Sequence, residues 1–466
     1  MACATGVLGA LAAWLVVMCR FPGRDIFSWA LALPLAAPAF AVAYAYADLF
    51  DVAGPLRMWL RAEAGFDLPW NMRTLAGAGF ILSCAFYPYV YLALRAALVN
   101  QSVHALEAAR TLGAGPFRTL WAVVLPLSRP ALAAGVALAV METLADFGAV
   151  QFLGVQTLTT GVVRAWFVYG SLASAAQFAL PLLGAAALLL WIERQSRKGR
   201  AHEGAGVRWR PLEPVPLKGA AAAGASLFCV ALLTAGLLLP VGWLAYGAFQ
   251  TSPEWPRVLA AAGRSASLAV IGAAVTVILA ALLALGGARW PLAGRLASLG
   301  YATPGAVMAI GLLVPASLVW RHVAGGAGHL GLGVLLLTYA YAARLMAAAL
   351  EPIEAGLARI TPSTVAAART LGRGEIGAAA AVQIPLARGA LLTAALLVFI
   401  DVLKELPATL ILRPFNFDTL AVMADNYARD ERLANAGWPS LLIILAALPG
   451  VIWLSRKVAG SRPGDS

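Results

Sequence analysis

Long apolar runs alternate with short polar and basic segments along the whole chain. A helix needs about 20 mostly apolar residues to cross the hydrocarbon core of a membrane. The pattern therefore predicts an all-α integral membrane protein with about eleven transmembrane helices, the first of them short. The predicted spans are residues 5–19, 28–47, 75–98, 130–153, 176–193, 220–247, 266–286, 296–320, 331–350, 389–411 and 438–455.

The composition supports a lipid-facing surface. Hydrophobic residues make up 61% of the 466 positions and charged residues 12%, whereas soluble domains have about 45–50% apolar and about 25% charged residues. The net charge of +12 would suit a nucleic-acid partner if it were gathered on one face. The basic residues are instead spread over many loops, so we expect a lipid membrane and no nucleic acid.

The cysteines and histidines form no ligand pattern. They are single residues with no CxxC, HxxxH or HExxH spacing, so we expect neither disulfides nor a metal site. They are Cys3, Cys19, Cys84, Cys229, His104, His202, His322 and His329.

The arginines and lysines indicate an orientation. If the loop 99–129 is cytoplasmic and the spans alternate, most of the 34 basic residues fall on the cytoplasmic side, as the positive-inside tendency requires. This assignment counts the five basic residues from Arg344 to Arg388 as cytoplasmic. It predicts a cytoplasmic C-terminus.

An internal repeat divides the chain. AARTLG occupies residues 108–113 and again 367–372, and the agreement continues to Pro126 and Pro385. Each copy lies between equivalent spans, so the repeats are parallel. The predicted domains are a first half at 1–193, a basic cytoplasmic linker at 194–219 and a second half at 220–466.

The two halves differ by one helix. The span at 266–286 aligns with the span at 5–19, and the earlier span at 220–247 has no counterpart in the first half. We therefore expect five spans in the first half and six in the second, the first helix of the first half being missing.

The repeated loop carries a motif. Residues 107–126 read EAARTLGAGPFRTLWAVVLP, and this segment resembles the EAA loop of bacterial binding-protein-dependent ABC importer permeases. Ala366 stands where the second copy should have Glu. The matching residues are Glu107, Ala108, Ala109, Arg110, Gly113 and Pro126 in the first copy and Ala367, Ala368, Arg369, Gly372 and Pro385 in the second.

The residue types of this loop predict a compact helical knob. Alanines with an acid at the start favour a short helix, a glycine allows the exit at positive φ, and the proline starts the helix that enters the membrane. The alternative is a generic amphipathic loop helix.

The resemblance implies a fold and partners. The fold would be two tandem bundles of the type I ABC importer permease kind in a bacterial inner membrane. The knobs would dock on two copies of a separate ABC ATPase subunit, and a periplasmic substrate-binding protein would deliver the substrate. This chain has no GxxxxGK[ST] loop, so we expect no enzyme activity and no cofactor in it, with ATP and Mg on the ATPase.

Two acidic pairs lie within predicted spans. Glu142 and Asp146, like Asp401 and Glu405, are four residues apart and so share one helix face. Ionisable groups at this depth usually face a bundle interior or a water path. They could line a path for a cation, or they could have a structural role, bonding neighbouring helices or capping a broken one; Lys404 is an adjacent partner. The sequence leaves both open.

Sequences near these acids suggest a substrate. Residues 144–167 and 401–422 resemble the ferric-iron branch of fused permeases, which implies iron(III) handed over by a binding protein; permeases for thiamine or inorganic anions share the architecture. The loop 412–437 is either a docking surface or a solvated loop. A secondary transporter, which commonly shows inverted repeats, is a more remote alternative, and a membrane enzyme lacks any supporting motif.

Overall fold

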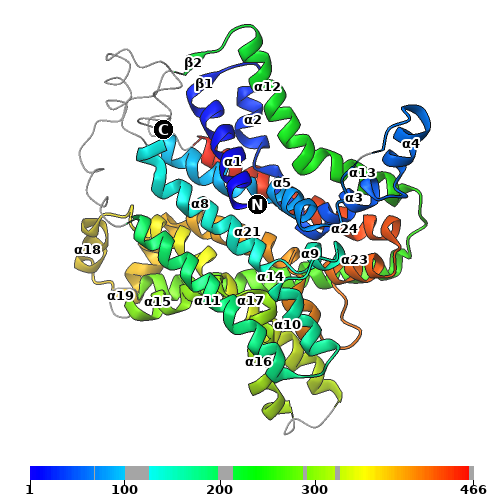
Figure 1. The fold of residues 1–466 in the computed structure, drawn as a ribbon. Helices are drawn as coiled ribbons and strands as arrows, with labels where there is room; N and C mark the ends of the chain where they lie inside the picture. Colours follow the sequence, from blue (N-terminus) through cyan, green and yellow to red (C-terminus); the bar gives the residue numbers. More distant parts are fainter. Residues whose placement is uncertain (68, 100–124, 198–213, 287–290, 321–325, 461–466) are drawn as a thin grey trace. The chain divides into compact units, whose positions relative to one another are not determined.

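The computed structural model describes residues 1–67, 69–99, 125–197, 214–286, 291–320 and 326–460. Within these ranges the secondary structure is helical except for two strands of two residues each, which confirms the expected all-α fold (Figure 1). The elements up to residue 197 are α1 (Ala2–Met18), β1 (Cys19–Arg20), α2 (Arg24–Ala30), η1 (Leu33–Ala36), α3 (Ala39–Phe50), α4 (Pro55–Glu63), α5 (Leu75–Val99), α8 (Leu125–Ala145), α9 (Gly148–Phe152), α10 (Leu158–Phe167) and α11 (Leu172–Arg197). The later elements are β2 (Val215–Pro216), α12 (Ala220–Leu233), η3 (Thr234–Leu238), α13 (Leu239–Phe249), α14 (Trp255–Leu285), α15 (Pro291–Ser298), η4 (Leu299–Ala302), α16 (Gly305–Trp320), α17 (Gly326–Leu357), α18 (Pro362–Thr370), α19 (Glu375–Ala378), η5 (Ala379–Gln383), α20 (Ile384–Leu386), α21 (Arg388–Leu403), α22 (Pro407–Leu412), α23 (Leu420–Arg429) and α24 (Leu433–Gly460).

Several helices are long and apolar enough to cross a membrane. In the described residues there are six such helices, or up to eight if each of two bent pairs counts as one span. The six are Leu75–Val99, Leu172–Leu189, Ala220–Phe249, Trp255–Leu285, Gly331–Leu357 and Leu433–Lys457. They match six of the eleven expected spans and make the chain a multi-pass membrane protein.

The other expected spans are shorter or broken. The one expected at 28–47 is wrong as a single helix, because the chain bends by 90° between Arg24–Ala36 and Ala39–Glu63. Pro38 lies at this bend with extended backbone, φ −62° and ψ 139°. Proline has no N–H for a helical hydrogen bond and disfavours helix in the residue before it.

Four other expected spans also differ from the helices in the structure. The span expected at 5–19 is the 17-residue apolar helix α1. Those expected at 130–153 and 296–320 fall on α8 with α9 and on α15 through α16, which are not among the six helices. The one expected at 389–411 belongs to the second bent pair.

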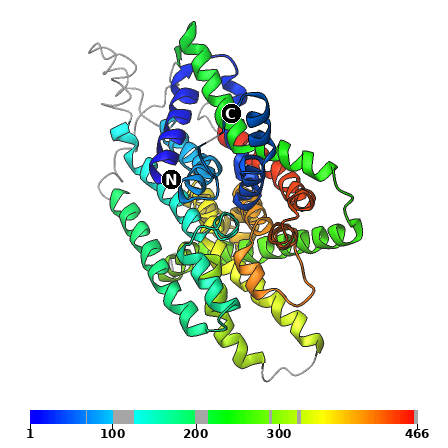
Figure 2. The same cartoon turned by 45° about the vertical axis from the view of Figure 1, so that its right-hand side comes forward.

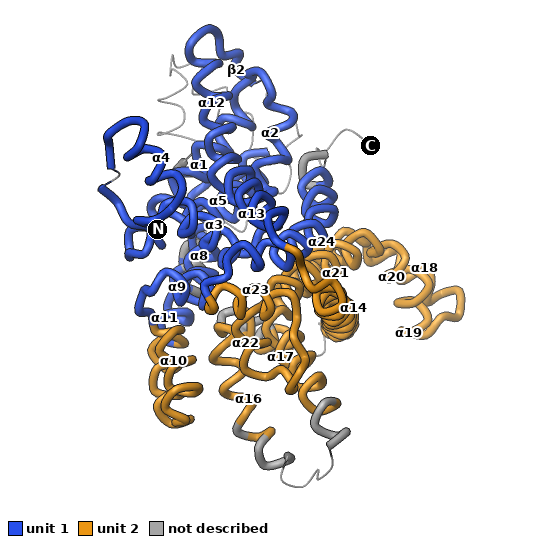
Figure 3. The backbone as a smooth tube through the Cα atoms, turned by 90° about the vertical axis from the view of Figure 1, so that its right-hand side faces the viewer, with its two compact units in different colours: residues 1–157, 184–251, 431–466 blue, residues 158–183, 252–430 orange. Residues whose placement is uncertain are grey.

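The chain forms two compact units, which are described separately (Figure 3). Unit 1 comprises residues 1–157, 184–251 and 431–466, and unit 2 comprises 158–183 and 252–430. Each unit takes residues from both sequence halves. The predicted domain boundaries at 193 and 220 therefore describe the repeat in the sequence and stay a prediction.

In unit 1, α1, α5 and α8 pack together and α3 packs against α9. Gly9 makes the contact of α1 with α5 close: a Cβ at this position would lie 2.9 Å from the Tyr87 carbonyl oxygen. Small residues allow this approach of helix backbones in membranes. Tyr87 and Tyr91 are fully buried beside it.

Unit 1 also holds the start of the second sequence half. The strand β2 pairs in parallel with β1, and the green helix α12 runs beside the blue N-terminal helices (Figure 2). Trp243 on α13 donates to the Asp48 carboxylate at 2.7 Å, and the Tyr46 hydroxyl donates to the Ala235 carbonyl at 2.7 Å. These bonds attach η3 and α13 to the first half.

In unit 2, α14, α17 and α21 pack together and α16 packs against α22. These helices are the repeat equivalents of α1, α5 and α8, and of α3 and α9, in unit 1. The parallel repeat seen in the sequence therefore has the same packing in both copies.

Candidate functional site

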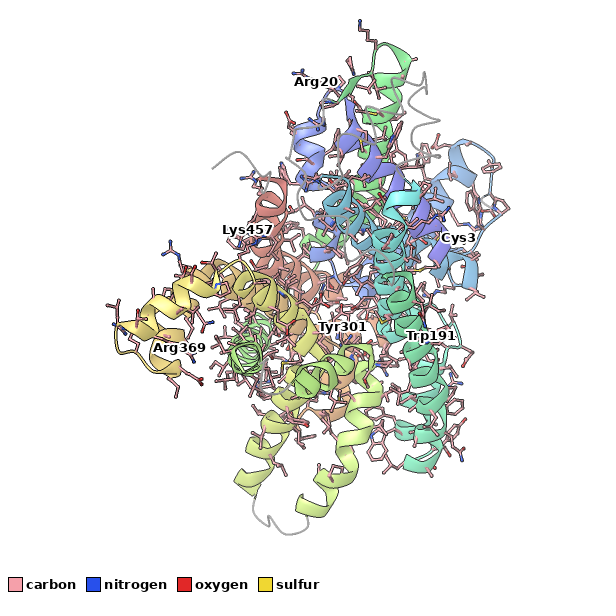
Figure 4. All side chains as sticks on the ribbon, turned by 90° about the vertical axis from the view of Figure 1, so that its left-hand side faces the viewer. Cys3, Arg20, Trp191, Tyr301, Arg369 and Lys457 are labelled. Atoms are coloured by element: carbon pink, nitrogen blue, oxygen red, sulfur yellow. The ribbon has the colours of Figure 1, made fainter. Side chains whose placement is uncertain are left out.

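The second copy of the repeated loop forms a helical knob on unit 2. It consists of α18, α19, η5 and α20, residues 362–386, with α18 packed against α19 and η5. Ala368 faces this contact and is buried. The knob projects from the rest of its unit in Figure 3, and Figure 4 places the labelled Arg369 on it.

Gly372 ends the first helix of the knob. Its φ of +83° is in the left-handed region, which glycine adopts without the steric cost that other residues pay. The Gly372 N–H donates to the Arg369 carbonyl and the Arg373 N–H to the Ala368 carbonyl. These two bonds form a Schellman motif, so the turn has the geometry that the sequence predicted.

The surface of the knob combines apolar and charged groups. Leu371 and Ile376 are 84% and 87% exposed, and both lie at the tip on either side of Gly372. Beside them Arg369 donates to Glu375 at 2.8 Å. Two highly exposed aliphatic side chains next to an ion pair suit a protein contact rather than a catalytic site.

In the second copy the proline of the motif, Pro385, does not start the membrane helix, contrary to expectation. The helical run Glu375–Leu386 continues through Pro385, and α21 begins at Arg388 after a bend of 73°. Pro385 follows the π-helical η5. The wider turn of a π-helix leaves room for the proline ring, and the backbone hydrogen bond that proline cannot donate is absent there. In the first copy Pro126 lies in the first described turn of α8.

The remaining predicted residues of the first copy lie outside the described residues. They are Glu107, Ala108, Ala109, Arg110 and Gly113. For both copies, the role of the motif residues as a partner contact stays a prediction.

Two of the four intramembrane acids cap short helices. Asp146 accepts from the N–H groups of Ala149 and Val150 at 3.1 and 3.2 Å, at the start of α9. Glu405 accepts from the N–H groups of Ala408 and Thr409 at 2.9 Å, at the start of α22. Each carboxylate thus satisfies backbone donors that a helix start leaves without an intrahelical partner.

Glu405 is also the centre of a buried network. It is 5% exposed and receives the Thr409 hydroxyl at 2.6 Å and the Arg344 guanidinium at 3.3 Å. The Tyr341 hydroxyl bonds the same threonine at 2.7 Å. The network links α17 with the break between α21 and α22.

The assignment of Arg344 to the cytoplasmic loops is therefore wrong. It lies within the candidate span Gly331–Leu357, and its side chain is 14% exposed and paired with Glu405. The signal that could have found it is the position of an arginine inside an apolar run, because such a residue needs an acidic partner.

The other two acids differ from this pattern. Asp401 pairs with Lys404 at 3.1 Å, the neighbour that the sequence suggested. Glu142 is a half-buried residue of α8. The structural role left open for the acids is thus observed for Asp146, Glu405 and Asp401, and the substrate path stays a prediction for all four.

The segment 412–437, expected as an outer loop, is largely ordered helix. The first six residues of α23, Leu420 to Asp425, are all buried, and Asp425 pairs with Arg429 at 2.7 Å. Phe415, at 92% exposure, belongs to the part that stays accessible. Among the residues that the structure describes, no three His, Cys, Asp or Glu side chains are grouped so that they could hold a metal ion.

Comparison with known proteins finds a family whose model matches the first part of the chain. Residues 6–198 match the family described as binding-protein-dependent transport system inner membrane component. The chain is 25% identical to the Fe(3+)-transport system permease protein FbpB 2 of Haemophilus influenzae, over 97% of this chain and 86% of that protein.

Two further relatives match part of the chain. The sulfate transport system permease protein CysT of Escherichia coli is 34% identical over 42% of this chain and 72% of its own length. The molybdenum transport system permease protein ModB of the same organism is 34% identical over 30% of this chain and 60% of its own length.

Proposed function

Because the chain belongs to the binding-protein-dependent transport system inner membrane components, the permease subunits of ABC importers, we propose that it passes ferric iron through a bacterial inner membrane. A periplasmic binding protein delivers the iron, and two copies of a separate ATPase subunit, which bind ATP and Mg, drive the transport. The two halves alternate between outward-open and inward-open states. The C-terminus and both repeated loops lie in the cytoplasm.

The observation that carries the mechanism is the knob at 362–386. A helix closed by a Schellman motif, with exposed Leu371 and Ile376 at its tip, offers a small rigid surface. An ATPase groove can close on such a surface and pull on α21, because the knob joins that helix through a bend and no long loop. The first copy, residues 104–126, performs the same role for the second ATPase subunit.

Iron is favoured as the substrate by the extent of the similarity. The iron permease relative aligns with 97% of this chain, whereas the sulfate and molybdenum permease relatives align with 42% and 30%. Those two relatives support an inorganic anion as the second candidate substrate. Thiamine is a third, from the shared architecture.

The test is uptake into proteoliposomes that contain this chain with its ATPase and its binding protein. Radioactive ferric iron, sulfate, molybdate and thiamine are offered separately, with and without ATP inside. We expect ATP-dependent uptake of iron alone. Loss of uptake on omitting the binding protein is part of the expected result.

The outcomes separate class from substrate. ATP-dependent uptake of an anion or thiamine in place of iron would keep the class and change the substrate. Iron uptake without any ATPase would contradict the proposed mechanism and favour a secondary transporter.

A further inference from the structure

The segment 51–74 between α3 and α5, which contains α4, is held together by ion pairs. The Arg57 side chain is 8% exposed and lies 2.9 Å from Asp67, and Arg61 lies 2.7 Å from the other oxygen of the same carboxylate. The hydrogen bond from Arg61, together with Arg57, holds the pKa of Asp67 below its ordinary value. One carboxylate thus joins two arginines of α4 to the chain that follows.

The same arginines also hold the backbone of the segment. Arg57 donates to the Trp70 carbonyl at 3.3 Å, and Arg61 donates to the Val52 carbonyl at 3.2 Å. Arg73 bonds Asp51 at 3.1 Å and closes the two ends. The segment is therefore a folded unit whose internal contacts are largely ionic.

The segment also exposes large apolar side chains. On α4, helical spacing places Trp59 opposite Arg57 and Arg61, with Met58 between the two sides. The exposed side chains are Met58 at 53%, Trp59 at 58%, Phe66 at 55% and Trp70 at 67%. Four large apolar side chains are thus exposed on one short segment, and of the paired charges only Arg57 is buried.

The segment lies next to a candidate membrane span in the chain, which suggests that its exposed apolar side chains contact lipid. It ends where the candidate span α5 begins, at Leu75, and Leu75 and Phe80 of that span are 76% and 47% exposed. Exposed apolar side chains thus occur both in the segment and at the adjoining start of the span, with the exposed polar residues Asn71, Arg73 and Thr74 between them. Tryptophan is enriched at the level of lipid headgroups, where its ring is apolar and its N–H is polar.

We propose that the segment 51–74 is an interfacial anchor, with Met58, Trp59, Phe66 and Trp70 inserted in the headgroup layer of the bilayer. The lipid surface is favoured over a protein partner because these exposed side chains adjoin the start of a candidate span and include two tryptophans. The anchor fixes the outer ends of α3 and α5 at one depth.

The test uses nitroxide labels on the full chain in lipid nanodiscs. Cys3, the exposed native cysteine, is first replaced by Cys3→Ser. Trp59→Cys and Trp70→Cys are then labelled one at a time, with Glu254→Cys as the control, since Glu254 is an exposed charged residue between α13 and α14. Collision of the label with oxygen, which concentrates in lipid, is compared with collision with a water-soluble nickel chelate.

We expect an oxygen-to-chelate ratio several-fold higher at positions 59 and 70 than at 254. Equal ratios at all three positions would overturn the proposal. Chelate access at 59 and 70 that is lost only when the binding protein is added would also overturn it, because the apolar face would then be a protein docking site. Quenching of tryptophan fluorescence by brominated lipid, reduced in Trp59→Phe and Trp70→Phe, is the expected result of a second measurement without labels.

Discussion

At position 372 the chain needs a residue that tolerates a φ of +83°. A Cβ placed there meets no neighbouring atom, so the cost of Gly372→Ala is the left-handed backbone itself, about 1 kcal/mol. We expect this variant to distort the tip of the knob and to lower the stimulation of ATP hydrolysis by the binding protein several-fold.

The matched control is Gly374→Ala. Gly374 lies in the same turn, also with open space around it, but its φ of −64° suits any residue. The measurement is the steady-state ATPase rate of the two variants, reconstituted at equal amounts, and we expect a loss only in Gly372→Ala. If both variants lose the same fraction of ATPase stimulation, the left-handed backbone of Gly372 is not required for that stimulation.

Glu405 allows the structural and the pathway roles of the intramembrane acids to be separated. Glu405→Ala removes the acceptor of two buried N–H groups, those of Ala408 and Thr409, at a cost of about 1–3 kcal/mol. Glu405→Gln keeps an oxygen acceptor at the same place. We expect thermal unfolding in detergent to occur at a clearly lower temperature for the alanine variant than for the glutamine variant.

Transport by the glutamine variant then tests the path. If Glu405 lines a cation path, Glu405→Gln loses uptake although its unfolding temperature stays near that of the wild type. Uptake that remains normal in Glu405→Gln and in Asp146→Asn leaves only the capping role.

At the scale of elements, the break after α21 depends on a close contact with α16. A Cβ on Gly305 would lie 2.6 Å from the Glu405 carboxylate and 3.3 Å from Pro407. That carboxylate cannot move aside easily, because Ala408, Thr409 and Arg344 hold it. We therefore expect Gly305→Ala to lower the unfolding temperature by several degrees and to reduce uptake.

Gly311→Ala, in the same helix, is the control, since a Cβ at position 311 would have no neighbouring atom within 4 Å. Replacing a helical glycine by alanine at such a site is neutral or stabilises by up to about 1 kcal/mol. Circular dichroism melts of both variants provide the measurement. A harmless Gly305→Ala would mean that α16 and α22 are not in close contact in the membrane.

For the whole molecule, the orientation can be tested by thiol labelling on a Cys3→Ser background. Ser363→Cys lies on the exposed knob and Glu254→Cys on an exposed turn. We expect a membrane-impermeant maleimide to label position 254 in intact cells and position 363 only after permeabilisation. The reverse order of labelling would invert the orientation inferred from the arginines.

Sequence reasoning succeeded where the deciding interactions are local. The first helix of the knob and the turn at Gly372 are formed by residues close together in the chain, and the motif contains those residues. It failed at Arg344, because its partner Glu405 is 61 residues away in the chain. It also failed at Pro38, where hydropathy alone suggested a continuous span and the proline bent it by 90°.

The pairing of β1 with β2 has a consequence for how the gene is organised. Cys19 and Arg20 pair with Val215 and Pro216, and Leu217 donates to the Arg20 carbonyl at 3.0 Å. With the bonds from Trp243 to Asp48 and from Tyr46 to Ala235, these contacts hold the beginning of the second half without the covalent connection at 198–213. Two polypeptides separated there are therefore expected to assemble into unit 1 without a peptide bond between them.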